Sequence, residues 1–166
     1  MVSRRKGPLS AWRIADGRYT IYSGVGARTQ GGRWNSPGTD VIYASESFSC
    51  AMLEQLARAG IGRIPEGHKW IKIDIPAIPI EVVEPEDIPG WDQEDWLASQ
   101  EYGDQWLKEQ RTAVLMVPSV VTNGLEKNVL INPAHRDFSK ITHTHPKKMQ
   151  WHQRFLVPPA PAERKK

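Results

Sequence analysis

The chain has 166 residues, of which 39% are hydrophobic and 25% charged, and its formal net charge is +3. This length fits one compact domain, and the composition excludes an intrinsically disordered chain and a membrane protein, whose spanning helix needs about 20 consecutive apolar residues. A single cysteine excludes an internal disulfide framework and predicts a cytoplasmic location.

The positive charge belongs to the ends of the chain. Removing six basic residues and one acidic residue of the two tails leaves 16 basic and 18 acidic residues, a net charge of −2. The removed residues are Arg4, Arg5, Lys6, Glu163, Arg164, Lys165 and Lys166. The body therefore does not predict a direct nucleic-acid binder. The basic start leads into Gly7 and Pro8 instead of an apolar core, so we expect neither a secretory signal nor a membrane partner.

Composition divides the chain into three parts. We expect residues 1–10 to form a flexible leader and residues 11–157 to form the folded domain. A Pro/Ala-rich and basic tail is expected over residues 158–166.

The first predicted elements surround a glycine-rich segment. Two short strands, at residues 12–14 and 19–22, are expected on either side of an Asp16-Gly17 turn. Residues 23–38 contain five glycines and predict a loop whose backbone can approach a ligand closely. A strand is predicted after this loop, over residues 41–44.

The clearest predicted helix covers residues 45–59. Ser45 or Ser47 can cap its start, and Gly60 can end it. Alternation of polar and apolar residues predicts a half-buried strand over residues 69–75. The prolines that follow indicate irregular chain or an edge strand.

An acidic segment occupies residues 81–109, where ten acidic residues and four aromatic residues accompany a single base. Residues 92–110 predict a helix that Gly103 weakens. Apolar runs predict two further strands, over residues 113–117 and 128–133. Short strands mixed with a few helices indicate an α+β fold.

The glycine-rich segment is the first candidate for a binding site. It contains Arg28 and Arg33, and guanidinium groups bind phosphate oxygens in bidentate fashion. Its Gly24-Val25-Gly26 run fails as a dinucleotide fingerprint, because no helix is expected directly after it and the third glycine is misplaced. A phosphate-binding loop and an ordinary surface loop both remain open.

Other polar residues also allow a structural interpretation. Glu54 lies four residues before Arg58, where a surface ion pair is common, and Ser119 follows Pro118, where hydroxyls often form turns. We expect Cys50 to be a small buried hydrophobe instead of a nucleophile. The spacing of the histidines matches no zinc template, so no metal site is expected.

A series of motifs in chain order resembles the RES domain family. The motifs are Trp12-Arg13, Gly31-Gly32-Arg33-Trp34-Asn35, Ile42-Tyr43-Ala44-Ser45, Ala51-Met52-Leu53-Glu54, Gly103-Asp104-Gln105-Trp106, Val117-Pro118-Ser119, Asn128-Val129-Leu130-Ile131-Asn132-Pro133 with His135, and Arg154. The resemblance runs from about Trp12 to Arg154. His152 stands where the family commonly has an aspartate, which leaves the role of Arg154 open.

The resemblance implies a fold and a function. The expected fold is a single α+β domain with the split, curved β-structure and flanking helices of ADP-ribosyltransferase toxins. The expected protein is the toxin of a bacterial type II toxin–antitoxin pair, with NAD as its substrate and no permanently bound cofactor. It would deplete NAD by hydrolysis or phosphorolysis, or transfer ADP-ribose to a protein target. A non-catalytic partner-binding module is the alternative from another class.

The resemblance also implies a partner. An Xre-like helix-turn-helix antitoxin would cover the active site, and DNA would be bound only through that antitoxin. A homodimer and a hetero-oligomer with the antitoxin both remain open. The acidic segment 81–109 could serve as a docking surface or form a solvated helix.

The family takes its name from an arginine, a glutamate and a serine, which correspond here to Arg33, Glu54 and Ser119. By the resemblance, Arg13 and Arg33 would hold the pyrophosphate of NAD, and Tyr43 would pack against nicotinamide or ribose. Glu54 would stabilise the positive charge that develops on ribose, and Ser119 would orient the nicotinamide riboside half. The expected catalytic residues are Glu54, Tyr43 and Arg33, and the further NAD-binding residues are Arg13, Ser119, Trp34, Asn35 and Asn128.

Overall fold

A computed structural model describes residues 1–60 and 63–155 of the chain. In this part nine strands form one sheet in the order β1-β5-β6-β7-β3-β2-β4-β8, and β9 also pairs with β4. The strands are β1 (Ser3–Lys6), β2 (Leu9–Asp16), β3 (Ile42–Ser45), β4 (His68–Ile75), β5 (Pro79–Val82), β6 (Val114–Pro118), β7 (Lys127–Ile131), β8 (Thr142–His143) and β9 (Lys147–Lys148). The helices are α1 (Val25–Gln30), α2 (Phe48–Ala59) and α3 (Leu97–Glu109), with 3-10 turns η1 (Pro85–Asp87), η2 (Val120–Thr122), η3 (Phe138–Lys140) and η4 (Gln153–Phe155).

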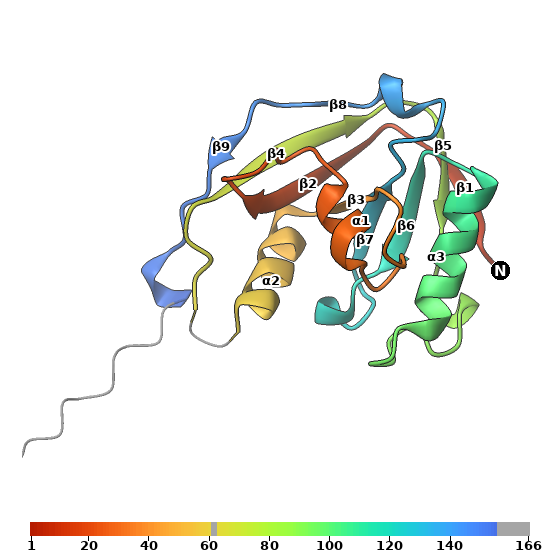
Figure 1. Cartoon of the computed structure of the whole chain (residues 1–166), viewed down its shortest axis with the longest axis horizontal. Coiled ribbons are helices and arrows are strands. Elements are labelled where there is room, and N and C mark those ends of the chain that lie inside the picture. Colours follow the sequence, from red (N-terminus) through yellow and green to blue (C-terminus); the bar gives the residue numbers. More distant parts are fainter. Residues whose placement is uncertain (61–62, 156–166) are drawn as a thin grey trace, which may run out of the picture.

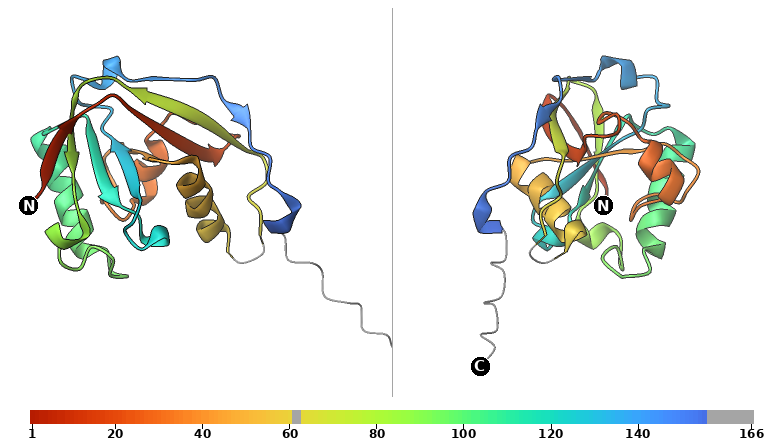
Figure 2. Two further views of the ribbon diagram at one scale, coloured as in Figure 1. Left: turned by 180° about the vertical axis from the view of Figure 1, so that it is seen from behind. Right: turned by 60° about the vertical axis from the view of Figure 1, so that its left-hand side comes forward.

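The sheet is curved and consists of two halves (Figure 1). β2 and β4 form a long antiparallel pair in one half, while β1, β5, β6 and β7 form the other, in which β5 and β6 are parallel. β3 joins the halves, because four of its residues pair with β7 and Ser45 pairs with Trp12 of β2. Figure 2 shows α3 beside the β5–β6 half and α2 beside β2 and β3. The expected α+β fold is confirmed.

Strand β6 contributes side chains to apolar clusters on both faces of the sheet. Val114 and Met116 contribute to one apolar cluster, while Leu115 and Val117 contribute to a second cluster that includes Trp106 of α3. These four residues of β6 are at most 1% exposed. A strand that is buried on both faces reads as a continuous apolar run, which is the pattern that the sequence shows here.

Several predicted elements are confirmed with their capping residues. α2 begins after Ser47, whose hydroxyl accepts a hydrogen bond from the amide of Cys50 at 3.0 Å. Gly60 follows the helix with a φ of 85°, a conformation that favours glycine. The strands expected near 12–14, 41–44, 69–75, 113–117 and 128–133 correspond to β2, β3, β4, β6 and β7. Cys50 is buried, as expected.

The prediction of a flexible leader over residues 1–10 is wrong. β1 pairs with β5 from Ser3 opposite Val82 to Lys6 opposite Pro79, and β2 already begins at Leu9. This pairing also corrects the expectation of irregular chain or an edge strand after residue 75, because β5 lies between β1 and β6. The ladder joins segments about 76 residues apart, a contact that no local pattern reports.

Three further expectations require correction. Residues 19–22 form no strand, because β2 pairs with β4 along its whole length instead. The glycine-rich segment is not a continuous loop, since α1 begins directly after Gly24. The helix expected from residue 92 begins at Leu97, after Trp96 in the left-handed region at φ 60°. The tail expected over residues 158–166 lies outside the described residues.

The helices of the described chain are too short and too polar to cross a membrane.

Candidate active site

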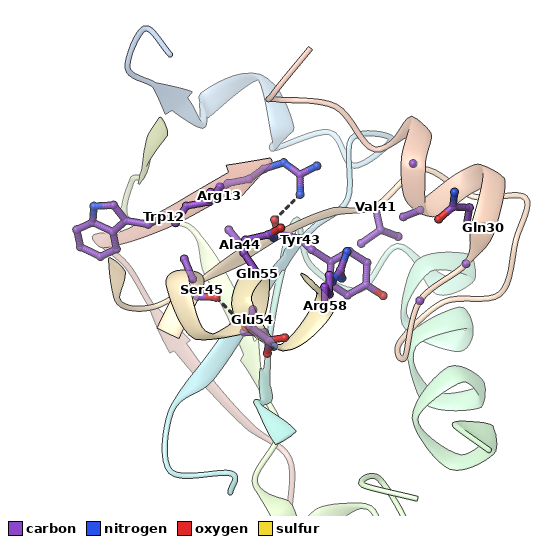
Figure 3. A pocket seen from close by; sticks show the side chains of 17 residues that line it. Trp12, Arg13, Gln30, Val41, Tyr43, Ala44, Ser45, Glu54, Gln55 and Arg58 are labelled. Atoms are coloured by element: carbon purple, nitrogen blue, oxygen red, sulfur yellow. Dashed lines mark hydrogen bonds between the residues drawn. The ribbon is translucent and has the colours of Figure 1, made fainter. Parts of the chain in front are cut away.

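A cavity of about 160 Å³ lies between α1, α2, β2 and β3 (Figure 3). Its walls include Trp12 and Arg13 of β2, Tyr43 of β3, Glu54 of α2 and Asn128 of β7. Four of these five residues belong to the expected site, so the fold brings together side chains that lie more than 100 residues apart.

Glu54 is held at this cavity by two donors from the sheet. Its Oε1 accepts a hydrogen bond from Ser119 Oγ at 2.9 Å and another from Asn128 Nδ2 at 2.5 Å. Ser119 is fully buried at the end of β6, so in this structure its hydroxyl positions Glu54 instead of lining the cavity. Glu54 Oε2 accepts no hydrogen bond from the described residues and stays available to a ligand.

A second layer of hydrogen bonds fixes Asn128. Its Oδ1 accepts from Ser45 Oγ at 2.8 Å, and the two residues are partners in the β3–β7 ladder. Cys50 lies beside this network, with its Sγ 3.9 Å from Asn128 Oδ1, and burial raises the pKa of its thiol. Cys50 therefore fits a packing role better than that of a nucleophile.

Tyr43 is oriented by the loop after α1. Its hydroxyl donates to Asn35 Oδ1 at 2.7 Å and accepts from the amide of Trp34 at 3.2 Å. Burial raises the pKa of Tyr43, so the phenol stays protonated. A Cβ at Gly32 would lie 2.7 Å from the Tyr43 hydroxyl, which explains the glycine there. Trp34 and Asn35 are at most 2% exposed, so they support the Tyr43 ring from behind the cavity wall.

Arg13 lines the cavity but is committed to backbone carbonyls. Its Nε donates to Ile21 at 2.6 Å, its Nη1 to Tyr43 at 2.6 Å and its Nη2 to Ser23 at 3.3 Å. Burial, and then the neighbouring charge of Arg58, lower the pKa of Arg13 to about 10. Its positive charge faces the cavity, while most of its donors tie β2 to β3 and to the loop after residue 20.

Arg33 does not line the cavity. Its Nη1 donates to the carbonyls of Trp91 at 3.0 Å and Gln93 at 2.8 Å, and its guanidinium lies 5.6 Å from the ring centre of Trp96. Burial lowers the pKa of Arg33. In this structure Arg33 thus fastens the glycine-rich loop to the acidic segment 81–109, and its expected contact with pyrophosphate stays a prediction.

Helix α3 clamps the same loop from outside. Asp104 accepts hydrogen bonds from the amide of Ser36 at 2.9 Å and from its hydroxyl at 2.6 Å. A Cβ at Gly103 would lie 1.8 Å from the carbonyl oxygen of Trp34, so this helix position requires glycine. Part of the acidic segment therefore supports the wall of the cavity.

Sequence patterns left three cavity residues unassigned. Arg58, Gln55 and Gln30 line the cavity, whereas the sequence predicts Arg58 only as an ion-pair partner of Glu54. No such ion pair forms among the described residues, because Glu54 turns toward Ser119 and Asn128. The spacing of Glu54, Gln55 and Arg58 within one turn of α2 is the signal that could have identified this face.

This arrangement can bind a cationic group against a fixed carboxylate. Glu54 presents a free oxygen at the cavity, and its side chain is held by buried Ser119 and by Asn128, so little reorganisation is needed when positive charge develops nearby. Within residues 1–60 and 63–155, no three His, Cys, Asp or Glu side chains are grouped as a metal site requires.

Comparisons with known proteins identify relatives of this chain. The model of the RES domain family matches residues 10–152. The Prs ADP-ribosylating toxin of Sphingobium sp. (strain YBL2) is 41% identical over 137 aligned residues, covering 77% of this chain and 84% of that protein. Toxin Res of Photorhabdus laumondii subsp. laumondii is 31% identical over 141 aligned residues, covering 80% of this chain and 87% of that protein.

The fold is shared with a solved structure. A chain in the crystal structure of the M. tuberculosis MbcT–MbcA toxin–antitoxin complex matches with a TM-score of 0.75 and 18% identity, covering 88% of this chain and 86% of that chain. The family match spans most of the sequence. The chain belongs to the RES domain family.

Proposed function

We propose that this protein is the toxin of a toxin–antitoxin pair and that it breaks the nicotinamide–ribose bond of NAD. The observation that carries the proposal is the Glu54 carboxylate, fixed at the cavity by buried Ser119 and by Asn128. The proposal is supported by the family and by relatives named as toxins, one of them an ADP-ribosylating toxin.

The proposed chemistry follows from the charge on the substrate. When the glycosidic bond breaks, its electron pair leaves with the pyridinium nitrogen, and positive charge develops on the ribose carbon. Nicotinamide departs as a neutral molecule, so no general acid is needed. Glu54 would stabilise the developing charge and accept hydrogen bonds from ribose hydroxyls, while the Tyr43 ring would form the adjoining wall. The lone pair of the acceptor then forms the new bond to this carbon.

Three acceptors fit this bond-breaking step. Water would give ADP-ribose, inorganic phosphate would give its 1-phosphate, and a protein side chain would become ADP-ribosylated. The relative of 41% identity is named for ADP-ribosylation, which favours a protein acceptor as the second candidate function. The acceptor depends on what can approach the cavity mouth and not on Glu54 itself.

The proposed partner is an Xre-like helix-turn-helix antitoxin that covers the cavity and supplies DNA binding. Apolar side chains flank the Glu54 network, and such exposed groups often mark partner surfaces. Leu53 on α2 is 45% exposed, Val120 after Ser119 is 38% exposed, and Leu125 in the next turn is 87% exposed. The match to a chain of a toxin–antitoxin complex supports an antitoxin as the partner.

The test follows NAD by mass spectrometry with purified protein, in buffers with and without inorganic phosphate. A third reaction adds NAD carrying a label in its adenine half to a bacterial extract and measures label on protein. We expect the wild type to release nicotinamide and Glu54→Gln to lose at least about 100-fold in turnover, because the variant keeps the volume but removes the charge. Glu101→Gln, an exposed change of the same kind on α3, is the matched control.

The products decide among the proposed reactions. ADP-ribose indicates hydrolysis, its 1-phosphate indicates phosphorolysis, and labelled protein indicates transfer. Intact NAD in all three reactions would contradict the enzymatic proposal and favour a partner-binding module. Undiminished turnover by Glu54→Gln would remove Glu54 from the centre.

A further inference from the structure

Two arginines line the cavity and a third, Arg33, directly follows two glycines of its lining, and the three differ in what their donors already bind. Arg13 donates to three backbone carbonyls and Arg33 to two. Arg58 lines the cavity, yet within residues 1–60 and 63–155 its guanidinium has no hydrogen bond and no ion pair. Arg58 is therefore the arginine whose full set of donors is open to a ligand.

The position of Arg58 is set by α2. It lies in the last turn of the helix, one turn beyond Glu54, and its charge lowers the pKa of Arg13. Figure 3 shows the Arg58 side chain in front of the Tyr43 ring, and the charge of Arg58 also acts on the hydroxyl of that ring. Arg58 is an exposed residue of α2 that contributes to the lining of the cavity.

Two amide side chains also line the cavity, one from α2 and one from α1. Gln55 of α2 and Gln30 of α1 line it, and in the described chain neither side chain makes a hydrogen bond. Together with Arg58 they provide a cation and two amides without protein acceptors. A ligand with negative charge and several acceptor oxygens would match these donors.

The two charged side chains that α2 contributes to the cavity have opposite signs. Glu54 presents negative charge at one position, and Arg58 presents positive charge four residues later, about 6 Å along the helix axis. An oxidised nicotinamide dinucleotide has the matching pattern, with a cationic nicotinamide on one side of a ribose and an anionic diphosphate on the other.

We propose that Arg58 binds the diphosphate of the dinucleotide, with Gln55 and Gln30 as further donors from the lining of the same cavity. The identity of this ligand rests on the proposed function. Arg58 anchors the anionic end of the substrate so that the ribose carbon lies against Glu54, while Arg13 and Arg33 hold the walls in place.

The test measures binding of ADP-ribose by titration calorimetry, together with the steady-state kinetics of NAD cleavage. ADP-ribose contains the diphosphate and lacks the bond that is cleaved, so binding is measured without turnover. We expect Arg58→Gln to raise the Kd of ADP-ribose and the KM of NAD at least tenfold, with a much smaller change in kcat. Arg58→Lys, which keeps the charge, should recover part of the affinity.

Arg63→Gln is the matched control, because Arg63 is an exposed arginine just beyond α2 that does not line the cavity. It removes the same charge and should leave both constants unchanged. The unfolding midpoint of each variant is measured, and a midpoint equal to that of the wild type excludes a folding defect. We expect equal midpoints, because substitutions at exposed positions change stability little.

Each result has one meaning. Wild type that cleaves NAD and an Arg58→Gln variant with unchanged Kd and KM would overturn the role of Arg58 and leave the proposed function standing. An equal loss in Arg63→Gln would also overturn it, since the effect would then be a long-range one. Wild type that neither cleaves NAD nor binds ADP-ribose would overturn both proposals together.

Discussion

The two sides of the cavity are held by different kinds of hydrogen bond. On the side formed by α2, β6 and β7, side chains hold side chains, since Glu54 is fixed by Ser119 and Asn128. On the side formed by β2, α1 and the loop after it, side chains hold backbone, since Arg13 and Arg33 donate to carbonyls of distant segments.

This difference predicts that substitutions on one side of the cavity change turnover and that substitutions on the other side change stability. The α2 side offers a carboxylate whose environment is polar and satisfied, so its substitution should change turnover more than stability. The loop side has little regular structure after α1 and depends on the two arginines and on α3 for its form. Its substitutions should change stability first, because they leave buried carbonyls without donors.

The largest effect is expected at Arg13, where an absence of the effect would contradict this comparison of the two sides. Arg13→Gln removes donors from the carbonyls of Ile21, Ser23 and Tyr43, and a glutamine cannot replace all three. We expect a loss of about 3 kcal/mol in the free energy of unfolding, measured with denaturant. The same substitution at Arg58 should change stability by less than about 0.5 kcal/mol. Equal losses at both positions would mean that Arg13 does not fasten the loop.

A smaller loss of stability is expected where α3 touches the loop. Gly103→Ala places a Cβ against the carbonyl of Trp34, so helix and loop must separate. We expect a loss of about 2 kcal/mol, although alanine has the higher helix propensity. Gly26→Ala in α1, where a Cβ meets nothing within 4 Å, is the control and should keep or slightly raise stability. A Gly103→Ala variant as stable as wild type would contradict the clamp.

The smallest effect is expected on the α2 side, in the turnover of a variant at Asn128. Asn128→Asp keeps the volume but replaces a donor to Glu54 with a second carboxylate, and two adjacent carboxylates retain a shared proton. We expect turnover at pH 7 to fall about tenfold, which is about 1.4 kcal/mol, and to recover toward higher pH as both groups ionise. A pH–rate profile measures this. A uniform loss at all pH values would indicate damaged structure instead of altered charge.

Much of the secondary structure could be predicted from local patterns. α2 follows from its serine cap and terminal glycine, and β4 follows from alternation of polar and apolar residues. The family motifs predict Glu54, Ser119 and Asn128 as site residues, and the fold places them in contact. Composition and spacing alone predicted only an ordinary surface glutamate and a turn serine.

Other features depended on partners far away in the sequence. The leader became β1 because β5 offered an open edge, and residues 19–22 formed no strand because β4 paired with β2. The roles of the arginines could not be predicted from the sequence either, because a guanidinium donates hydrogen bonds to a carbonyl oxygen and to a phosphate oxygen alike.

The sequence by itself determined the family, the α+β class and the capped helix that carries Glu54, because each depends on residue types and short spacings. Only the tertiary structure decided which side chains face the cavity and which arginine remains open to a ligand. Those outcomes depend on hydrogen bonds between segments tens of residues apart. They form because a carbonyl or carboxylate that folding removes from water requires a hydrogen-bond donor from the protein.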